Sequence, residues 1–244
     1  MKLKTFIASS LVLSSTLFAG GNITPIEPIV EDVEVVNTWN YSASMYMWAA
    51  GLDGKDAILG NEIDISFSDI LDNLDMAFMG TFTAQKGKWG GLVDIVYMKL
   101  GNDIAPGLHF NYKAKIIAPS LTYQLIESDE LQLHLLIGAR YLYMENSLST
   151  LPTRSGHVWD GVIGLKGQYN FTQRWFMPFQ VDIGTGDTDS TWQAFAGLGY
   201  AYENFDIIAG WRSLNWNFDD KHPGGKLFNN LTISGPMIGL KYRF

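Results

Sequence analysis

The chain has 244 residues, of which 47% are hydrophobic, 14% aromatic and only 17% charged, and its formal net charge is −8. That length suits one substantial domain or two small ones, and the composition is too apolar for a disordered chain. The acidic balance argues against nucleic acid as a partner, because binding to phosphates needs a basic surface. The absence of cysteine excludes disulfides, thiolate catalysis and cysteine-ligated metals.

Residues 1–20 have the pattern of an export signal. Two lysines precede an apolar run that ends at Phe18, and Ala19–Gly21 supply small residues for cleavage. We expect export through the Sec pathway, and the alternative of a membrane anchor is disfavoured because the run is short. Residues 21–38 combine prolines with acidic residues and are expected to form a periplasmic N-terminal segment, with a short strand at 33–36 as the alternative.

Between Trp39 and Phe244 the sequence alternates with a period of two, and turn residues interrupt the pattern. The mature region has no apolar run of about 18 residues, the length that a transmembrane helix needs. In 133–143 the set containing Arg140 must face a lumen, because an arginine in the middle of the lipid face costs about 2–4 kcal/mol. We therefore expect an all-β fold, a single antiparallel up-and-down transmembrane β-barrel of about ten strands, with eight or twelve as alternatives. The expected strands cover residues 39–50, 75–86, 89–101, 109–126, 130–146, 156–170, 174–184, 190–203, 205–218 and 229–244.

Aromatic residues of the outward-facing set collect at two depths. One group lies near the short turns, expected to be periplasmic, and the other near the longer connections, expected to be external; such belts mark the two interfaces of a membrane. A soluble ligand-binding barrel of the lipocalin type is the disfavoured alternative, because its exterior would be polar. The periplasmic group is Trp89, Tyr123, Tyr169, Trp175, Tyr200, Tyr202 and Tyr242, and the external group is Tyr97, Tyr141, Tyr143, Trp159, Trp192 and Trp211.

The chain ends in alternating apolar residues with an aromatic residue last, namely Ile238, Leu240, Tyr242 and Phe244. This ending resembles the C-terminal signature of bacterial outer-membrane barrels, and residues 39–244 resemble the small barrels of the OmpA, opacity-protein and related uncharacterised families. The resemblance implies an outer-membrane location, contact with outer-membrane lipid or lipopolysaccharide, and recognition of Leu240, Tyr242 and Phe244 by the barrel-assembly machinery. Function is not carried over, since these families include adhesins, structural barrels, narrow channels and a few enzymes.

Charged and polar residues of both signs occupy the inward-facing set. Mixed charges in a narrow lumen are expected to pair, because burying one charge alone is costly. We expect a monomer with a structural or surface-interaction role, and the alternative is a gated pore for small solutes, although a selective filter favours one sign of charge. Small solutes or an external surface ligand are the further partners considered, and no metal or cofactor is implied. The expected lumen network is Asp94, His134, Arg140, Asp160, Lys166, Asp182, Gln193, Arg212, Lys241 and Arg243, with Gln124 and Gln180 on the same face.

The first external connection, expected at Gly51–Asp75, contains a helical pattern. Ser66 and Asp69 form a weak capping box, and four apolar residues follow at the spacing of one helix face. Two turns of exposed helix are unstable alone, so we expect the helix to cover the external mouth or enter the lumen as a lid or plug. The alternative is packing against the outer wall or the bilayer interface. The four apolar residues are Phe67, Ile70, Leu71 and Leu74.

Two further loop patterns are less specific. The stretch 184–190, with Asp187 and Asp189, has the composition of a calcium-binding loop, but glycine and aspartate also serve any tight turn. An outer-membrane hydrolase would need histidine and aspartate at the external rim, where His157, His222 and Asp219 are expected. Such residues are common in loops without catalysis, so we expect the protein not to be an enzyme.

Overall fold

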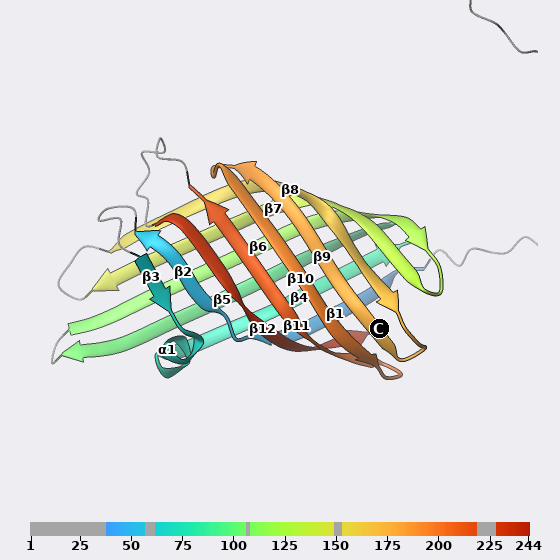
Figure 1. The fold of residues 1–244 in the computed structure, drawn as a ribbon, viewed down its shortest axis with the longest axis horizontal. Coiled ribbons are helices and arrows are strands. Elements are labelled where there is room, and N and C mark those ends of the chain that lie inside the picture. Colours follow the sequence, from blue (N-terminus) through green and yellow to red (C-terminus); the bar gives the residue numbers. More distant parts are fainter. Residues whose placement is uncertain (1–37, 57–61, 106–107, 149–152, 219–227) are drawn as a thin grey trace, which may run out of the picture. The chain divides into compact units, whose positions relative to one another are not determined.

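The computed structural model describes residues 38–56, 62–105, 108–148, 153–218 and 228–244. Strands that follow one another in the chain pair antiparallel, and β12 pairs back with β1, so that ten strands close into a barrel (Figure 1). This confirms the predicted all-β barrel and its strand number. The expected export signal at 1–20 and almost all of the expected segment at 21–38 lie outside the described residues. The barrel strands are β1 (Asn40–Trp48), β4 (Leu74–Lys86), β5 (Trp89–Ala105), β6 (Leu108–Glu127), β7 (Leu131–Leu148), β8 (Arg154–Asn170), β9 (Trp175–Gly186), β10 (Ser190–Ala201), β11 (Phe205–Asn217) and β12 (Phe228–Arg243).

The short turns lie at one end of the barrel, together with the start of β1 and the last residue of the chain. We name this the short-turn end and the opposite one the long-connection end. Between β4 and β5, Gly87 has a φ of 55°, a left-handed conformation that glycine adopts without a steric penalty. At the same end the first and last strands are joined, because Tyr41 N–H donates to the Phe244 carbonyl at 3.2 Å and Phe244 N–H to the Tyr41 carbonyl at 3.1 Å. In outer-membrane barrels such short turns face the periplasm.

The outer surface of the barrel is apolar in its middle and aromatic toward both ends. Ile137, Ile163 and Ile183 are neighbours in register across β7, β8 and β9, and they are 54%, 50% and 66% exposed. Such a row is stable when it faces hydrocarbon rather than water. Exposed aromatic residues near the short-turn end include Trp39, Trp89, Tyr169, Trp175, Tyr202, Tyr242 and Phe244, and those nearer the other end include Trp159, Trp192 and Trp211.

The connection expected at Gly51–Asp75 is not a plain loop, and the expected end of the first strand at residue 50 is wrong. Strand β2 (Gly51–Asp56) continues the line of β1 and pairs with the first part of β12, and β3 (Glu62–Ile65) folds back on β2. Between β1 and β2 the ladder is interrupted at Pro236, which has no N–H to donate, although its carbonyl accepts from Ala49 N–H at 2.8 Å.

The predicted helix in this segment is present as α1 (Phe67–Asp72). Ser66 caps it: its hydroxyl accepts from Asp69 N–H at 3.3 Å, and Ser66 N–H donates to the Asp69 carboxylate at 3.2 Å. Leu74, expected on the helix, instead begins β4. No helix in the described part of the chain combines the length and the apolar character that membrane crossing requires.

Candidate functional site

The inward-facing side chains are arranged in three layers along the barrel, and β1 passes through all of them. Ser42 and Ser44 line a cavity that reaches the short-turn end. Tyr46 belongs to a layer of charged and polar groups, and Trp48 to a cluster of apolar side chains toward the long-connection end. The period of two places these residues inside, because every second side chain of a strand faces the same side.

The charged layer has its first centre at Arg212 of β11. This guanidinium donates to the Asp94 carboxylate at 2.7 Å, to the Tyr46 hydroxyl at 2.8 Å and to the Gln193 side-chain oxygen at 2.9 Å. Asp94 also accepts from Tyr46 at 2.7 Å and from the Thr81 hydroxyl at 2.8 Å. The charges are thus neutralised and hydrogen-bonded, which is the condition for burying them at tolerable cost.

A second centre of the charged layer is Arg140 of β7, whose exposed fraction is 1%. Its guanidinium forms a salt bridge with Asp182 of β9 and donates to the Thr191 hydroxyl at 2.9 Å. Asp182 accepts a further hydrogen bond from the Gln180 side chain at 3.0 Å. Arg140 is in register with Asp160 on β8, yet its salt bridge reaches the strand beyond.

Asp160 and Asp206 are also buried, and they have different partners. Asp160 accepts from the N–H and the hydroxyl of Thr188 at 3.0 and 2.9 Å, so it fixes the connection between β9 and β10 over the barrel. Asp206 accepts two hydrogen bonds from Arg243, at 2.7 and 2.9 Å. Arg243 therefore lies at the short-turn rim, below the charged layer.

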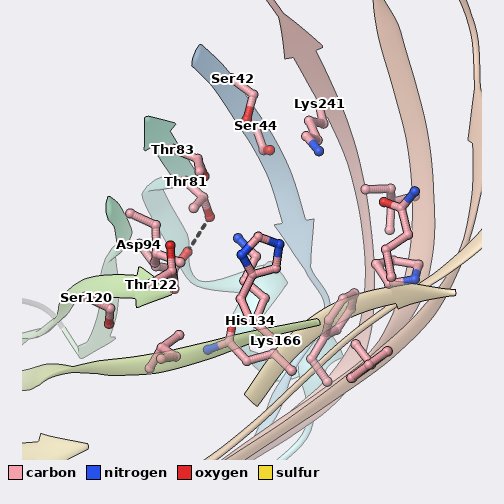
Figure 2. A pocket seen from close by; sticks show the side chains of 18 of the residues that line it. Ser42, Ser44, Thr81, Thr83, Asp94, Ser120, Thr122, His134, Lys166 and Lys241 are labelled. Atoms are coloured by element: carbon pink, nitrogen blue, oxygen red, sulfur yellow. Dashed lines mark hydrogen bonds between the residues drawn. The ribbon is translucent and has the colours of Figure 1, made fainter. Parts of the chain in front are cut away.

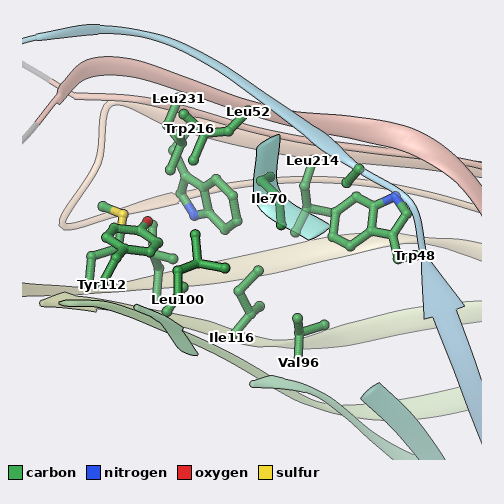
Figure 3. Close-up of a cluster of buried hydrophobic side chains, with 14 of the residues drawn as sticks. Trp48, Leu52, Ile70, Val96, Leu100, Tyr112, Ile116, Leu214, Trp216 and Leu231 are labelled. Atoms are coloured by element: carbon green, nitrogen blue, oxygen red, sulfur yellow. The ribbon is translucent and has the colours of Figure 1, made fainter. Parts of the chain in front are cut away.

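Apolar side chains fill the barrel between the charged layer and the long-connection end (Figure 3). They come from walls that face each other across the lumen, since β5, β6 and β7 contribute on one side and β11 and β12 on the other. Trp216, Leu214 and Leu231 are fully buried. The apolar cluster comprises Tyr46, Trp48, Ala50, Leu52, Ile70, Val96, Leu100, Tyr112, Ala114, Ile116, Leu142, Met144, Leu214, Trp216 and Leu231.

Helix α1 reaches this cluster through Ile70, which is 7% exposed, whereas Leu71 is 51% exposed. Phe67 and Leu74 are intermediate in burial. The remaining buried members of the cluster lie on the barrel strands, on β2 and, for Ala50, in the short link between β1 and β2. The helix thus supplies one buried side chain to a filling made mainly by the strands.

A cavity of about 650 Å³ occupies the short-turn half of the lumen, and we name it the short-turn cavity. Figure 2 shows His134, Lys166 and Lys241 at its wall, together with hydroxyl side chains such as Ser44 and Thr122. Residues from the strand ends at the short-turn end also line it, so the cavity reaches that rim. The lining at this end includes Asn40, Gln132, Gln168, Pro178, Arg243 and Phe244.

The sequence analysis missed the apolar cluster and five polar partners. The partners are four hydroxyl side chains and one acid, namely Tyr46, Thr81, Thr188, Thr191 and Asp206. A signal for the cluster is present in the sequence, because strands such as β7 lose their alternation toward the long-connection end: Tyr141, Leu142, Tyr143 and Met144 are apolar or aromatic on both faces. Nothing in the sequence marked the hydroxyls, whose partners lie on other strands.

The loop patterns give no catalytic or metal arrangement among the residues that the structure describes. Asp187 accepts a hydrogen bond from Trp159 N–H at 2.8 Å, and no three histidine or acidic side chains of the described ranges are placed to hold a metal ion. His157 lies beside Tyr141 on the outer wall, with ring centroids 6.1 Å apart. His222 and Asp219 lie outside the described residues.

Comparison with known proteins found no matching family model and no curated protein with a matching sequence. Solved structures with a similar arrangement include the outer-membrane protease OmpT from Escherichia coli, at 9% identity over 86% of this chain and 98% of that chain, with a TM-score of 0.49. Another is Ail, the attachment invasion locus protein of Yersinia pestis, in complex with the heparin analogue sucrose octasulfate, at 12% identity over 84% and 98%, with a TM-score of 0.41. Neisserial surface protein A is 14% identical over 84% and 97%, with a TM-score of 0.38. These similarities are too low to carry an argument.

The closed barrel and its own exterior place the chain in a membrane. Each of the ten barrel strands is paired on both sides, so the barrel wall presents no open edge to lipid, and the exposed outer row is apolar between aromatic belts. A spanning β-structure must be closed in this way, because hydrocarbon offers no hydrogen-bond partner. The protein is therefore an integral membrane β-barrel.

Proposed function

We propose that the protein is a non-conducting outer-membrane barrel with a structural and surface-interaction role. The observation that carries the proposal is the filling of the lumen by two successive layers, the charged layer and the apolar cluster. Water and ions pass poorly through an apolar constriction, which excludes water by dewetting. The arginines of the charged layer are held by carboxylates and hydroxyls, so their side chains are not free to leave a path.

Its surface role is supported by the length of four neighbouring strands. A tilted strand needs about 9–11 residues to cross the membrane, whereas β5, β6, β7 and β8 have 17, 20, 18 and 17 residues. They extend furthest toward the long-connection end, at the left of Figure 1. On this wall Lys113 pairs with Glu145 at 2.8 Å and Lys99 with Asp75 at 2.8 Å. A polar wall above the membrane offers a surface to an external ligand.

A gated pore for small solutes is the second candidate, and the short-turn cavity favours it. The short-turn cavity already leaves the short-turn half of the lumen open. Displacement of the apolar cluster would therefore open a continuous path for solutes along the lumen. In this interpretation α1 would act as the plug. Helix α1 contributes only one buried side chain, Ile70, to the apolar cluster. Closure by the strand side chains is therefore better supported than a plug formed by α1.

Single-channel conductance of the refolded chain in a planar bilayer tests the proposal. The intact chain, a variant lacking residues 66–73, and the double variant Trp216→Ala/Leu231→Ala would be compared. We expect no conductance from the intact chain or the helix deletion, because strand side chains close the lumen in both. We expect conductance from the double variant, which removes two fully buried side chains of the cluster.

Conductance of the intact chain would contradict the proposal and identify a small pore. Conductance that begins only when residues 66–73 are removed would instead make α1 a plug and the protein a gated channel. The substitution Trp211→Ala is the matched control, since Trp211 is an exposed tryptophan of the outer wall, and it should leave the lumen closed.

Partners in the envelope follow from the location. Outer-membrane lipid surrounds the barrel, and we propose lipopolysaccharide among its contacts. Leu240 and Tyr242 of β12, and Phe244 directly after it, are exposed, and Phe244 stacks with Tyr41 at 6.0 Å between ring centroids. Recognition of these three residues by the barrel-assembly machinery stays a prediction, as does the monomeric state.

A further inference from the structure

The short-turn cavity contains more positive charge than its carboxylates neutralise. Its two lining carboxylates are Asp94 and Asp182, and each is already engaged by an arginine of the charged layer. Lys166 and Lys241 line the same space. Within the described ranges, neither lysine has a carboxylate at salt-bridge distance. Two ammonium groups are therefore left over inside a confined volume.

These lysines approach the cavity from opposite sides of the barrel. Lys241 lies on β12 and Lys166 on β8, which is four strands away through β9, β10 and β11 and six strands away in the other direction through β1. Figure 2 shows both side chains, together with His134, projecting into the same space. Asp206 is the register neighbour of Lys241, but its carboxylate is held by Arg243. A group bound between the lysines would meet positive charge on two sides.

Hydroxyl groups complete the wall around the lysines. Ser42, Ser44, Thr83, Ser120 and Thr122 line the cavity, and each hydroxyl can donate to an anionic oxygen. Lysine contributes a compact point charge with several donors, which suits phosphate. The volume of about 650 Å³ lies within the range of about 300–1,000 Å³ that small-molecule sites occupy.

We infer that the short-turn cavity binds a small, soluble, phosphate-bearing solute that enters from the periplasmic side. Lys166 and Lys241 hold the phosphate group, and the hydroxyl side chains contact its oxygens and its polar body. A soluble solute is favoured over a lipid headgroup because the closed ladder of strands separates the cavity from the surrounding lipid. This inference does not depend on whether the barrel conducts, since a sealed barrel and a gated one would both expose the short-turn cavity to the periplasm.

Isothermal titration of the refolded full chain with glucose 6-phosphate tests the inference. The protein would be kept in zwitterionic micelles at low ionic strength, and glucose would serve as the uncharged probe. We expect glucose 6-phosphate to bind, inorganic phosphate to compete with it, and glucose to give no signal. Equal binding of both sugars, or no binding of glucose 6-phosphate at millimolar concentration, would overturn the inference.

Substitution of the two lysines locates the site. The double variant Lys166→Gln/Lys241→Gln should weaken binding of glucose 6-phosphate by at least about tenfold, because each ammonium that faces the phosphate is lost. Lys113→Gln, on the outer wall, is the matched control and should bind like the unchanged chain. Unchanged affinity in the double variant would place the phosphate elsewhere and sink the proposal. If the double variant does not fold, Lys241→Gln alone, with folding checked by heat-dependent gel migration, keeps the comparison decisive.

Discussion

Arg212 and Asp94 meet inside the barrel although 118 positions separate them in the chain. Both are buried, and Tyr46 and Gln193 occupy further hydrogen-bonding positions around the guanidinium. Trp48 adds a cation–π contact, with the guanidinium carbon 5.0 Å from its ring centroid. A single residue here has many partners, so its removal leaves several buried polar groups without a partner.

The substitution Arg212→Met should therefore destabilise the barrel by about 3–5 kcal/mol, because it leaves Asp94 as an uncompensated buried charge. The free energy of unfolding would be measured by urea denaturation in lipid vesicles, followed by tryptophan fluorescence. Lys113→Met removes a lysine from a partly exposed salt bridge and should change the free energy of unfolding by less than about 1 kcal/mol.

Removing both Arg212 and Asp94 charges distinguishes the stability that comes from the ion pair from the stability that comes from side-chain packing. In the double variant Arg212→Met/Asp94→Asn the buried charge is gone, so part of the stability lost in the single variant should return. A double variant as unstable as the sum of the two single variants would show that the ion pair contributes no coupling. The same denaturation assay applies.

At the scale of one element, α1 is held by its cap and by one anchor. A six-residue helix is too short to be stable alone. Ile70 fixes it to the apolar cluster, while its neighbour Leu71 faces outward. The two side chains are of equal size and differ in burial, which makes them a matched pair for substitution.

Ile70→Ala should destabilise the barrel by about 2 kcal/mol, at the low end for a buried aliphatic truncation because the helix can adjust. Leu71→Ala should change the free energy of unfolding by less than about 0.5 kcal/mol. Both are measured by urea denaturation in vesicles. Equal effects at the two positions would mean that the helix does not pack on the cluster.

Ser66→Ala tests the cap without disturbing the cluster. Loss of the hydroxyl leaves the Asp69 N–H without its partner, which should weaken the helix by about 1 kcal/mol. Hydrogen exchange at the amides of Asp69 and Ile70 should then be faster, while exchange in β6 and β7 stays unchanged. Slower or unchanged exchange in α1 would contradict the capping role.

At the scale of the whole molecule, the outer wall of the barrel is inverted relative to the surface of a soluble protein, because apolar residues are exposed around its middle. The cost of a charge on the outer wall should therefore depend on depth. Ile163 lies in the middle of the outer row on β8, and Met177 lies on β9 two residues from Trp175, toward the short-turn end.

Ile163→Arg should destabilise the barrel in lipid vesicles by about 2–4 kcal/mol, and Met177→Arg by about 0–1 kcal/mol, since an arginine near the interface reaches water and headgroups. Urea denaturation of both variants gives the comparison. Equal costs at the two positions would place the bilayer at a different level on the barrel.

The barrel and its strand number were predictable because the sequence signals for strands and turns are local. Alternation in 133–143 assigns Arg140 to one face and Ile137 to the other, and turn residues mark where strands reverse. The helix at Phe67–Asp72 was visible for the same reason, since its cap and its spacing lie within one short segment. The end of the first strand was missed because β2 is stabilised by β12, which lies at the other end of the chain.

The sequence by itself determined the strands, the face on which each side chain lies, and the apolar exterior that requires a membrane, because all of these depend on spacing along one strand. Only the tertiary structure decided which partners meet. Arg140 bypasses its register neighbour Asp160 and pairs with Asp182, while Lys166 and Lys241 face a shared cavity from opposite walls. The physical reason is that strand closure brings together residues far apart in sequence. Pairing, filling and cavity volume are then set by distances across the lumen, which no local pattern encodes.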